Sequence, residues 1–305
     1  MSILVVGSVA FDTIHNHLGT HPKVLGGSAT YASLAAAPYA PTQLVGVVGR
    51  DFPEDAIELM RRKRIGLDGL EVADGKTFHW EGRYTDDLTS RVSISTELNV
   101  FADFEPKVPK EARSVPYVLL GNIHPTLQMQ VLDQLDSPKL VIADTMNFWI
   151  EGTPNELAEM LKRIDVLVIN EDEARQLSGL YNIVKAAEKL RAAGPSTVII
   201  KRGEYGALLF RASELFHAPA LPLREVQDPT GAGDTFAGAF LGFVASRDAT
   251  DEETLRQAVV HGSAVASYCV EGMSVSGLVD IKKQDIETRV DLFRRLIHIP
   301  TNPVH

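Results

Sequence analysis

Short, nearly continuous apolar runs recur along the chain, and helix-like stretches separate them. Runs of this kind, bounded by Gly or polar residues, predict buried strands at 3–10, 43–49, 117–123, 139–146, 166–170 and 197–201, and shorter strands at 205–211 and 214–218. Helices are expected at 28–37, 54–64, 126–135, 153–164, 171–179, 182–193, 235–244 and 252–267. Strands that are apolar on both faces and alternate with helices indicate an α/β fold with a parallel sheet covered on both sides.

Between Thr77 and Phe101 the pattern changes. Polar and apolar positions alternate here, and β-branched and aromatic residues are frequent. The alternating stretches flank DDLTS at 86–90, which is typical of a turn, so we expect a half-solvated antiparallel hairpin. The sequence has no internal repeat and no long linker. We therefore expect one domain over residues 1–305, with an inserted β lid at about 76–108.

Charge and cysteine content narrow the classes of function. Thirty basic and forty acidic residues give a net charge of −10, which argues against nucleic-acid and anionic-membrane partners. The sole cysteine, Cys269, lies in an apolar run, so an intrachain disulfide and a thiolate metal cluster are excluded and a buried thiol is expected. The first residues lack the basic segment of a signal peptide, and no run reaches about 18 apolar residues, so we expect a cytoplasmic protein.

The stretch DPTGAGDTF at 228–236 carries the clearest chemical signal. Gly231, Ala232 and Gly233 are followed by Asp234 and then by an apolar, helix-like sequence. Small residues at a helix start leave backbone N–H groups uncovered at the positive end of the helix dipole, which favours a bound phosphate. An acid in the first turn is also explained by helix capping, and Asp228 and Thr230 have the same capping ability.

Two other nucleotide motifs are absent from the sequence. There is no GxxxxGK[ST], which excludes a P-loop, and the first strand is followed by GSVAFD where a dinucleotide site would require G-x-G-x-x-G. A dehydrogenase is therefore disfavoured, and the turn before Asp234 is the leading phosphate site.

Three motifs together resemble one family. DPTGAGDTFAGAF at 228–240 resembles the C-terminal signature of the ribokinase-like (PfkB) carbohydrate kinases, LGGSATYASLAAA resembles the N-terminal signature, and NEDEA at 170–174 matches an N-x-x-E motif. The match spans essentially the whole chain. The resemblance implies a ribokinase-like α/β fold, with a central, mostly parallel sheet, helices on both faces and a small β-sheet lid. It also implies an ATP-dependent kinase.

The resemblance gives the phosphate turn its catalytic roles. Asp234 is the expected base, which takes the proton of an acceptor hydroxyl as its oxygen attacks the γ-phosphoryl group of ATP. The amides of Gly231, Ala232 and Gly233 form the expected anion hole. This assignment is chemically reasonable because phosphoryl transfer depends on positioning and charge stabilisation, and because a base must lie within reach of the attacking hydroxyl.

A second group of residues is expected near the metal and the nucleotide phosphates. By resemblance, Asn170 belongs to the nucleotide site and Glu173 organises Mg²⁺ through water. Both residues equally fit an ordinary capped helix start, as Glu171 and Asp172 do. Lys201, which ends a predicted strand, is placed to reach a phosphate.

The nucleotide edge is expected near the turn KRGEYG. Gly203 and Gly206 would allow the backbone to approach the nucleotide, although a plain hairpin turn explains them too. His261 falls where the family lines the adenine pocket, and a structural role on a packed helix is the alternative.

A monovalent cation site beside the anion hole is common in the family. Asp228 and Thr230 match one of the loops that supply its ligands, and Gly272 and Ser276 match the second loop by spacing. Activation by K⁺ is therefore a hypothesis.

The acceptor is expected to bind near the first strand. The family places a hydroxyl-binding carboxylate where this chain has Asp12, and Gly26 and Gly27 would let the chain pass close to a sugar. A carboxylate accepts hydrogen bonds from two hydroxyls, and it is costly to bury without such partners. Asn122 and His124 follow a core strand at positions that could reach the acceptor.

Two departures from the family pattern leave the acceptor open. Tyr31 stands where many sugar kinases carry a substrate-binding Asn, so by resemblance it is expected at the acceptor site. DTMNFW at 144–149 replaces the frequent D-x-N-x-R. A small neutral sugar is the leading acceptor, a nucleoside or cyclitol is the alternative, and a non-catalytic sensor of sugar or nucleotide is a further one. The intact Asp234 argues against a sensor.

Lid residues carry the remaining expectations. Trp80 and Phe101 either cover the substrate or form a small core of the lid. Arg83 and Arg91 are expected to be solvated, which leaves no arginine pair for a phosphorylated acceptor. Unpaired strand edges of the lid offer a route to a homodimer.

Overall fold

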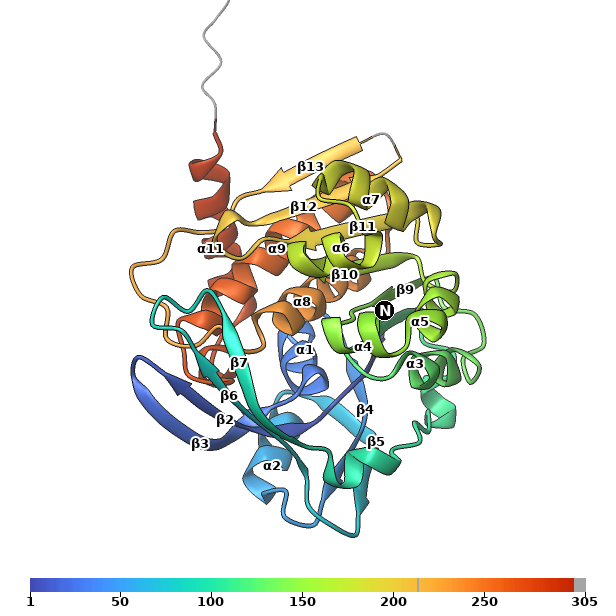
Figure 1. The fold of residues 1–305 in the computed structure, drawn as a ribbon, viewed down its shortest axis with the longest axis vertical. Helices are drawn as coiled ribbons and strands as arrows, with labels where there is room; N and C mark the ends of the chain where they lie inside the picture. Colours follow the sequence, from blue (N-terminus) through green and yellow to red (C-terminus); the bar gives the residue numbers. More distant parts are fainter. Residues whose placement is uncertain (213, 299–305) are drawn as a thin grey trace, which may run out of the picture.

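The fold is built on two β-sheets of different size (Figure 1), and the computed structural model describes residues 1–212 and 214–298. In the larger sheet the strand order is β13-β12-β11-β10-β9-β8-β1-β4-β5. All strands from β11 to β5 pair in parallel, whereas β12 and β13 are added by antiparallel pairing. Its strands are β1 (Ile3–Val6), β4 (Thr42–Gly49), β5 (Ile65–Ala73), β8 (Tyr117–Leu120), β9 (Leu140–Ala143), β10 (Val166–Asn170), β11 (Thr197–Lys201), β12 (Ala207–Arg211) and β13 (Glu214–Ala218).

Helices cover both faces of this sheet, as the near-continuous apolar strands predicted. Alternate residues of β1 enter two separate cores: Ile3 and Val5 pack on one face, and Leu4 and Val6 on the other. The first face is covered by α1 (Ser28–Ala36), α2 (Glu54–Arg62), α8 (Ala232–Arg247), α9 (Glu252–Val270), α10 (Ser276–Val279) and α11 (Lys283–Leu296). The second is covered by α3 (Pro125–Leu132), α4 (Asn147–Gly152), α5 (Pro154–Leu161), α6 (Glu171–Ser178) and α7 (Ile183–Ala192).

The smaller sheet contains more of the chain than the sequence indicated. Its order is β3-β2-β6-β7, with strands β2 (Ala10–Asn16), β3 (Gly19–Gly26), β6 (Phe78–Tyr84) and β7 (Arg91–Glu97). The antiparallel β6–β7 pair is the expected hairpin. Strands β2 and β3 lie outside the range 76–108 given to the lid, so half of the sheet was missed.

The apolar run 3–10 is broken where the chain changes sheets. Strand β1 ends at Val6 and β2 begins at Ala10, so the expected single strand is wrong. A β-carbon on Gly7 would overlap Ser28 Oγ, which shows how closely the chain passes the start of α1 here. This close passage carries the chain from the larger sheet to the smaller one.

Several further elements were not predicted. Strand β5 is a partly exposed edge with a register shift against β4, and α4, α10 and α11 occupy stretches that the sequence analysis left unassigned. Residues 99–112 contain two short 3-10 helices on the way to β8. Phe101 stacks between Phe78 and Phe104, with ring centroids 5.4 and 5.6 Å away, so it belongs to a local aromatic core.

Several predicted site residues lie at the carboxyl ends of parallel strands of the larger sheet: Asn170 ends β10, Lys201 ends β11, and Asn122 follows β8. Parallel strands end together there, and ligands of open α/β sheets bind beyond the carboxyl ends of such strands. Helices α1 and α8 both start after a glycine with positive φ, Gly27 at 97° and Gly231 at 74°. Within the described part of the chain, no helix is long and apolar enough to cross a membrane.

Candidate active site

Asp12 is a buried carboxylate beside the Gly26–Gly27 turn. It lies on β2 with 5% of its surface exposed, and a β-carbon on Gly26 would overlap its Oδ2. Burial, together with the negative charges of Asp228 and Asp234, raises the pKa of Asp12 to about 7. No side chain or amide among the described residues donates a hydrogen bond to this carboxylate, so both oxygens can accept hydroxyls.

The turn before α8 has the form expected of an anion site. Gly231 adopts the left-handed conformation, and Asp234 lies in the first turn of the helix. Burial raises the pKa of Asp234 to about 7, and the charge of Asp144 adds to the shift while Lys201 opposes it. Amide donors and a carboxylate thus share one turn.

Tyr31 lies beneath this turn. It is 1% exposed, and a β-carbon on Gly231 would overlap its ring. The position that holds a substrate-binding Asn in many sugar kinases therefore holds a buried ring here that supports Gly231 from below. In this structure Tyr31 has no surface with which to contact an acceptor.

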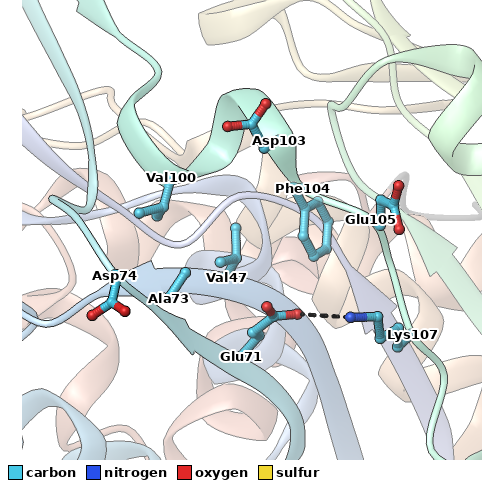
Figure 2. A pocket seen from close by; sticks show the side chains of 9 residues that line it. All are labelled: Val47, Glu71, Ala73, Asp74, Val100, Asp103, Phe104, Glu105 and Lys107. Atoms are coloured by element: carbon cyan, nitrogen blue, oxygen red, sulfur yellow. Dashed lines mark ion pairs between the residues drawn. The ribbon is translucent and has the colours of Figure 1, made fainter.

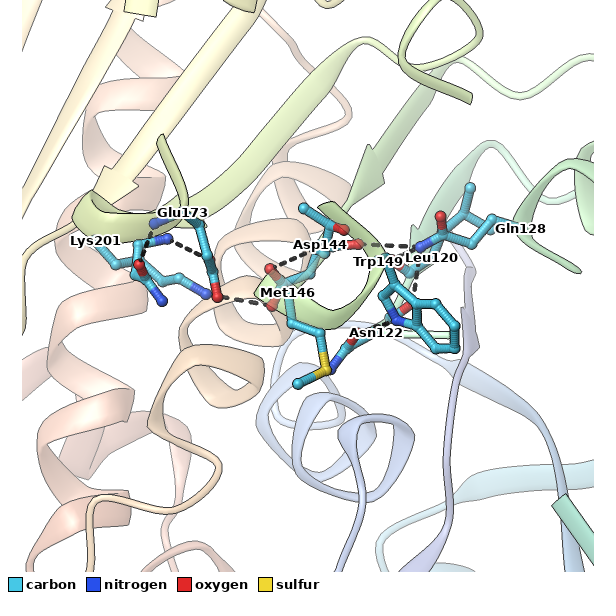
Figure 3. Close-up of polar contacts among 11 residues, drawn as sticks. Leu120, Asn122, Gln128, Asp144, Met146, Trp149, Glu173 and Lys201 are labelled. Carbon is cyan, nitrogen blue, oxygen red and sulfur yellow. Dashed lines mark hydrogen bonds and ion pairs between the residues drawn. The ribbon is translucent and has the colours of Figure 1, made fainter. Parts of the chain in front are cut away.

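Lys201 approaches the turn from the end of β11. Its Nζ lies 3.3 Å from Asp144 Oδ2, and a β-carbon on Gly233 would lie 2.8 Å from the same Nζ. Burial opposes the lysine charge, but Asp144, Glu173 and Asp234 outweigh it and raise the pKa of Lys201. Figure 3 shows the side chains of Lys201 and Glu173 together, facing Asp144, so a positive charge stands beside the anion site.

Asn170 and Glu173 form a complete capping box at the start of α6. Asn170 Oδ1 accepts from the Glu173 amide and Glu173 Oε2 accepts from the Asn170 amide, both at 2.8 Å. Burial and the charge of Asp144 raise the pKa of Glu173 to about 7, while Lys201 opposes the shift. The capping role is therefore real, and the carboxylate also faces the charged cluster around Lys201.

Asp228 joins the two loops that sequence spacing paired. Its Oδ1 accepts from the Thr230 amide and its Oδ2 from the Ser274 amide, each at 2.9 Å. Gly272 lies against Ser276, because a β-carbon on the glycine would lie 2.6 Å from the serine Oγ. Ser274, which has a φ of 54°, was missed because nothing in its local sequence marks it.

Asn122 and His124 hold an aromatic group near the end of β8. Asn122 Oδ1 accepts from Trp149 Nε1 at 2.8 Å, and its Nδ2 lies 2.9 Å from Met146 Sδ (Figure 3). His124 Nδ1 accepts from the Thr126 amide, and its ring meets Trp149 edge to face with centroids 5.1 Å apart. These residues connect to the acceptor side because Gly121, which precedes Asn122, packs against Ser28 after the Gly26–Gly27 turn.

The predicted nucleotide-edge residues fall into two environments. Gly203 and Gly206 both have positive φ and form the turn between β11 and β12, with Gly203 open to solvent. His261 is 3% exposed, with Nδ1 3.0 Å from Tyr39 Oη and its ring 4.0 Å from Phe243. Burial lowers the pKa of His261 to about 4. These core contacts account for the histidine without a bound nucleotide.

Four residues near the site were missed or misplaced by sequence reasoning. Asp144 directly follows β9, and a carboxylate at the end of a buried strand was a usable signal. Arg91 is exposed, as expected, yet its charge lowers the pKa of both Asp12 and Asp234. Its guanidinium also lies 5.5 Å from the Trp80 ring centroid. Tyr84 and Ser274 were found through tertiary contacts alone.

A cavity of about 200 Å³ lies at the β4–β5 edge, away from these residues (Figure 2). Its charged lining is mostly acidic, and Lys107 pairs with Glu71 at 3.5 Å. A pocket with this charge repels phosphate, and it contains none of the predicted site residues. The lining consists of Val47, Glu71, Ala73, Asp74, Val100, Asp103, Phe104, Glu105 and Lys107.

Comparison with known proteins agrees with the motifs. Residues 2–281 match the model of the pfkB family of carbohydrate kinases. The cytidine kinase of Thermococcus kodakarensis is 30% identical over 247 residues, covering 79% of this chain and 87% of that protein.

Solved structures show the same fold. The nucleoside kinase of Methanocaldococcus jannaschii, a member of the ribokinase family, matches with a TM-score of 0.76 at 19% identity, covering 95% of this chain and 98% of that one. The aminoimidazole riboside kinase of Salmonella enterica, solved with aminoimidazole riboside and an ATP analogue, matches with a TM-score of 0.73 at 20% identity, covering 95% and 100%.

Proposed function

The chain belongs to the pfkB family of carbohydrate kinases, which are phosphotransferases with hydroxyl acceptors, and we propose that it transfers the γ-phosphoryl group of ATP to a hydroxyl of a small neutral sugar. The observation that carries the proposal is the start of α8. Gly231 adopts the left-handed conformation, Ala232 and Gly233 begin α8 with Lys201 Nζ against Gly233, and Asp234 lies in the same first turn of the helix. Both sheets act as one kinase domain, with the smaller sheet as the lid.

Asp234 is the general base of the proposed reaction. Its raised pKa of about 7 makes it a better proton acceptor than an ordinary carboxylate and keeps a useful fraction ionised at neutral pH. It takes the proton of the acceptor hydroxyl as that oxygen forms a bond to the γ-phosphorus and ADP leaves. The amides of Gly231, Ala232 and Gly233, together with Lys201, stabilise the charge on the transferring group.

The nucleotide and Mg²⁺ fit the cluster around Lys201. Repulsion from Asp144 contributes to the raised pKa of both Glu173 and Asp234, and a divalent cation bound with ATP would relieve that repulsion. Within residues 1–212 and 214–298, no three His, Cys, Asp or Glu side chains stand close enough to hold a metal by themselves. Mg²⁺ would therefore take most ligands from water and phosphate, with Glu173 acting through water.

The nucleotide would lie along the ends of β10 and β11. Asn170, Lys201, Gly203 and Gly206 are the residues that we assign to it. A K⁺ ion would lie between the loops joined by Asp228, with backbone carbonyls of these loops among its ligands. A stimulation of activity by K⁺ over Na⁺ tests this assignment.

The acceptor binds between Asp12 and the end of β8. Asp12 holds two hydroxyls of the acceptor, since its carboxylate is buried and accepts no hydrogen bond from the residues that the structure describes. A nucleoside is the second candidate. The aromatic rings of Trp149 and His124 offer stacking surface for a base, and the relative from Thermococcus kodakarensis is a cytidine kinase.

The lid is also the proposed contact between two copies of the chain. Val92, Ile94 and Leu98 on and after the edge strand β7 are 69%, 49% and 46% exposed, and an unpaired strand edge of this kind favours association. Sedimentation of the wild type against Ile94→Lys tests the dimer. We place the enzyme in the cytoplasm, where ATP is available.

An acceptor screen tests the function. ATP consumption is measured with sugars, sugar phosphates, nucleosides and inositols, and no turnover with any acceptor would favour the sensor. With the acceptor in hand, Asp12→Ala should raise its KM at least about tenfold, because unpaired polar groups remain in a buried site. Asp86→Ala, which changes an exposed acid in the turn between β6 and β7, is the control and should behave as wild type. An unchanged KM in Asp12→Ala would contradict the assignment.

A further inference from the structure

Tyr84, at the end of β6, joins the lid sheet to the turn that precedes α8. Its side chain is 7% exposed, and its hydroxyl lies 3.0 Å from Thr230 Oγ1. Strand β6 contributes this contact across 146 positions of sequence, so local sequence gives no sign of it. A buried tyrosine hydroxyl normally keeps a hydrogen-bond partner, and here the Thr230 hydroxyl of the phosphate turn is one.

Thr230 directly precedes Gly231, so its carbonyl and the Gly231 amide belong to the same peptide unit. Its N–H donates to Asp228 Oδ1 at 2.9 Å, and its carbonyl lies 3.7 Å from Cys269 Sγ. The next amide along the chain is that of Gly231, the first donor of the proposed anion hole. The hydroxyl of Thr230 is thus held from the lid, while its backbone is held from the loops beneath.

Two further hydrogen bonds connect the lid sheet to the same pair of loops. Asn16 Nδ2 donates to the Gln227 carbonyl at 2.8 Å, and Ser274 Oγ donates to the Leu25 carbonyl. Strands β2, β3 and β6 therefore all contact the loops that carry the phosphate turn. Because Tyr84 reaches the residue next to Gly231, its contact is the one closest to the transferring group.

We propose that Tyr84 is a positioning residue whose hydroxyl, acting through Thr230, orients the Gly231 amide toward the transferring phosphoryl group when the lid covers the acceptor. This proposal rests on the function proposed above. The anion hole is then complete when the lid is in contact and less well ordered when it is not. Wasteful transfer of the phosphoryl group to a water molecule is thereby reduced. The alternative is that the Tyr84 ring simply fills space.

The test separates the hydroxyl from the ring. Tyr84→Phe keeps the ring and removes the hydrogen bond, and it should lower kcat about five- to tenfold with near-wild-type KM for ATP, as loss of one buried hydrogen bond implies. Thr230→Val should have the same effect, Thr230→Ser should keep most of the activity, and the Tyr84→Phe, Thr230→Val double variant should be no slower than either single variant.

Tyr117→Phe is the matched control. It removes a hydroxyl that donates to Asp248 at 2.8 Å from a fully buried ring. Tyr117 begins β8, whereas the site residues follow the end of this strand, so the variant should leave kcat unchanged. Tyr84→Phe within twofold of wild type, or losses that multiply in the double variant, would overturn the role of Tyr84. A wild-type protein that phosphorylates no acceptor would instead overturn the proposed function.

ATP hydrolysis without acceptor, measured in the same variants, should rise in neither Tyr84→Phe nor Thr230→Val, and a rise in either would also contradict the proposal.

Discussion

The Lys201 ammonium lies directly against the backbone of Gly233, where a β-carbon would come within 2.8 Å of Nζ. The lysine therefore requires a residue without a side chain at this position. The same ammonium pairs with Asp144 at 3.3 Å, so its place beside the phosphate turn is fixed from two sides.

Gly233→Ala should displace Lys201 and lower kcat at least about tenfold, because removing one preorganised charge or donor from an anion site typically costs more than that. The thermal midpoint should stay the same or rise, since Ala favours a helix over Gly. Gly152→Ala is the control, because a β-carbon there meets nothing within 4 Å. Steady-state kinetics and thermal melts check both variants, and wild-type kcat in Gly233→Ala would place the phosphate elsewhere.

Activity should depend on the ionisation of the buried acids. A general base works only when it is deprotonated, and the pKa of Asp234 is raised to about 7, so kcat/KM should fall as pH decreases below about 7. The pKa of Asp12 is also raised to about 7, so the decline of kcat/KM should be steeper than the protonation of a single group would give. A kcat/KM profile that stays flat down to pH 5.5 would contradict these shifts.

Stability should respond to pH in the opposite sense. Asp12 has a pKa of 3.8 in the unfolded chain and about 7 in the fold. Its contribution to the free energy of unfolding is therefore fully present below pH 3.8 and is lost as pH rises through 7. Asp12→Asn removes the buried charge, and it should raise the thermal midpoint of the ligand-free protein at pH 8 by at least about 2 °C, with a smaller gain at pH 5. Equal gains at both pH values would show that the charge is not the cause.

The metal prediction has a control in the neighbouring residue. Glu173→Gln keeps a side chain that completes the capping box but removes the charge, and it should raise the Mg²⁺ concentration needed for half-maximal activity at least about tenfold. Asp172→Asn changes an acid of the same helix turn whose side chain is 98% exposed, and it should leave the Mg²⁺ requirement unchanged. Full activity in excess EDTA would exclude the metal.

The parallel sheet and the phosphate turn could be predicted because their signals are local. An apolar run or the DPTGAGD motif can be recognised from a few consecutive residues, and the family resemblance gave the order of the elements. Strands β2 and β3 could not be predicted in this way, because residues 10–26 have mixed burial and because β2 joins the sheet by pairing with β6, more than 60 residues away.

Individual side chains were predicted less well than the motifs. Tyr31 was assigned to the acceptor from its place in a signature, yet its ring lies under Gly231. Asp144, Arg91 and Tyr84 reach the site through strand pairing and lid packing, which the order of residues does not reveal. Figure 3 shows Asp144 between Lys201 on one side and the Asn122–Trp149 pair on the other, which the sequence presents as separate motifs.

The most direct measurement is kcat for Asp234→Asn with the acceptor found in the screen. The substitution keeps the size of the side chain and removes the proton acceptor, so kcat should fall about 10²- to 10⁴-fold while the Kd of ATP stays near wild type. That result would establish Asp234 as the base of a phosphoryl transfer to a hydroxyl. Wild-type turnover by Asp234→Asn, in a protein that still binds ATP, would contradict the account.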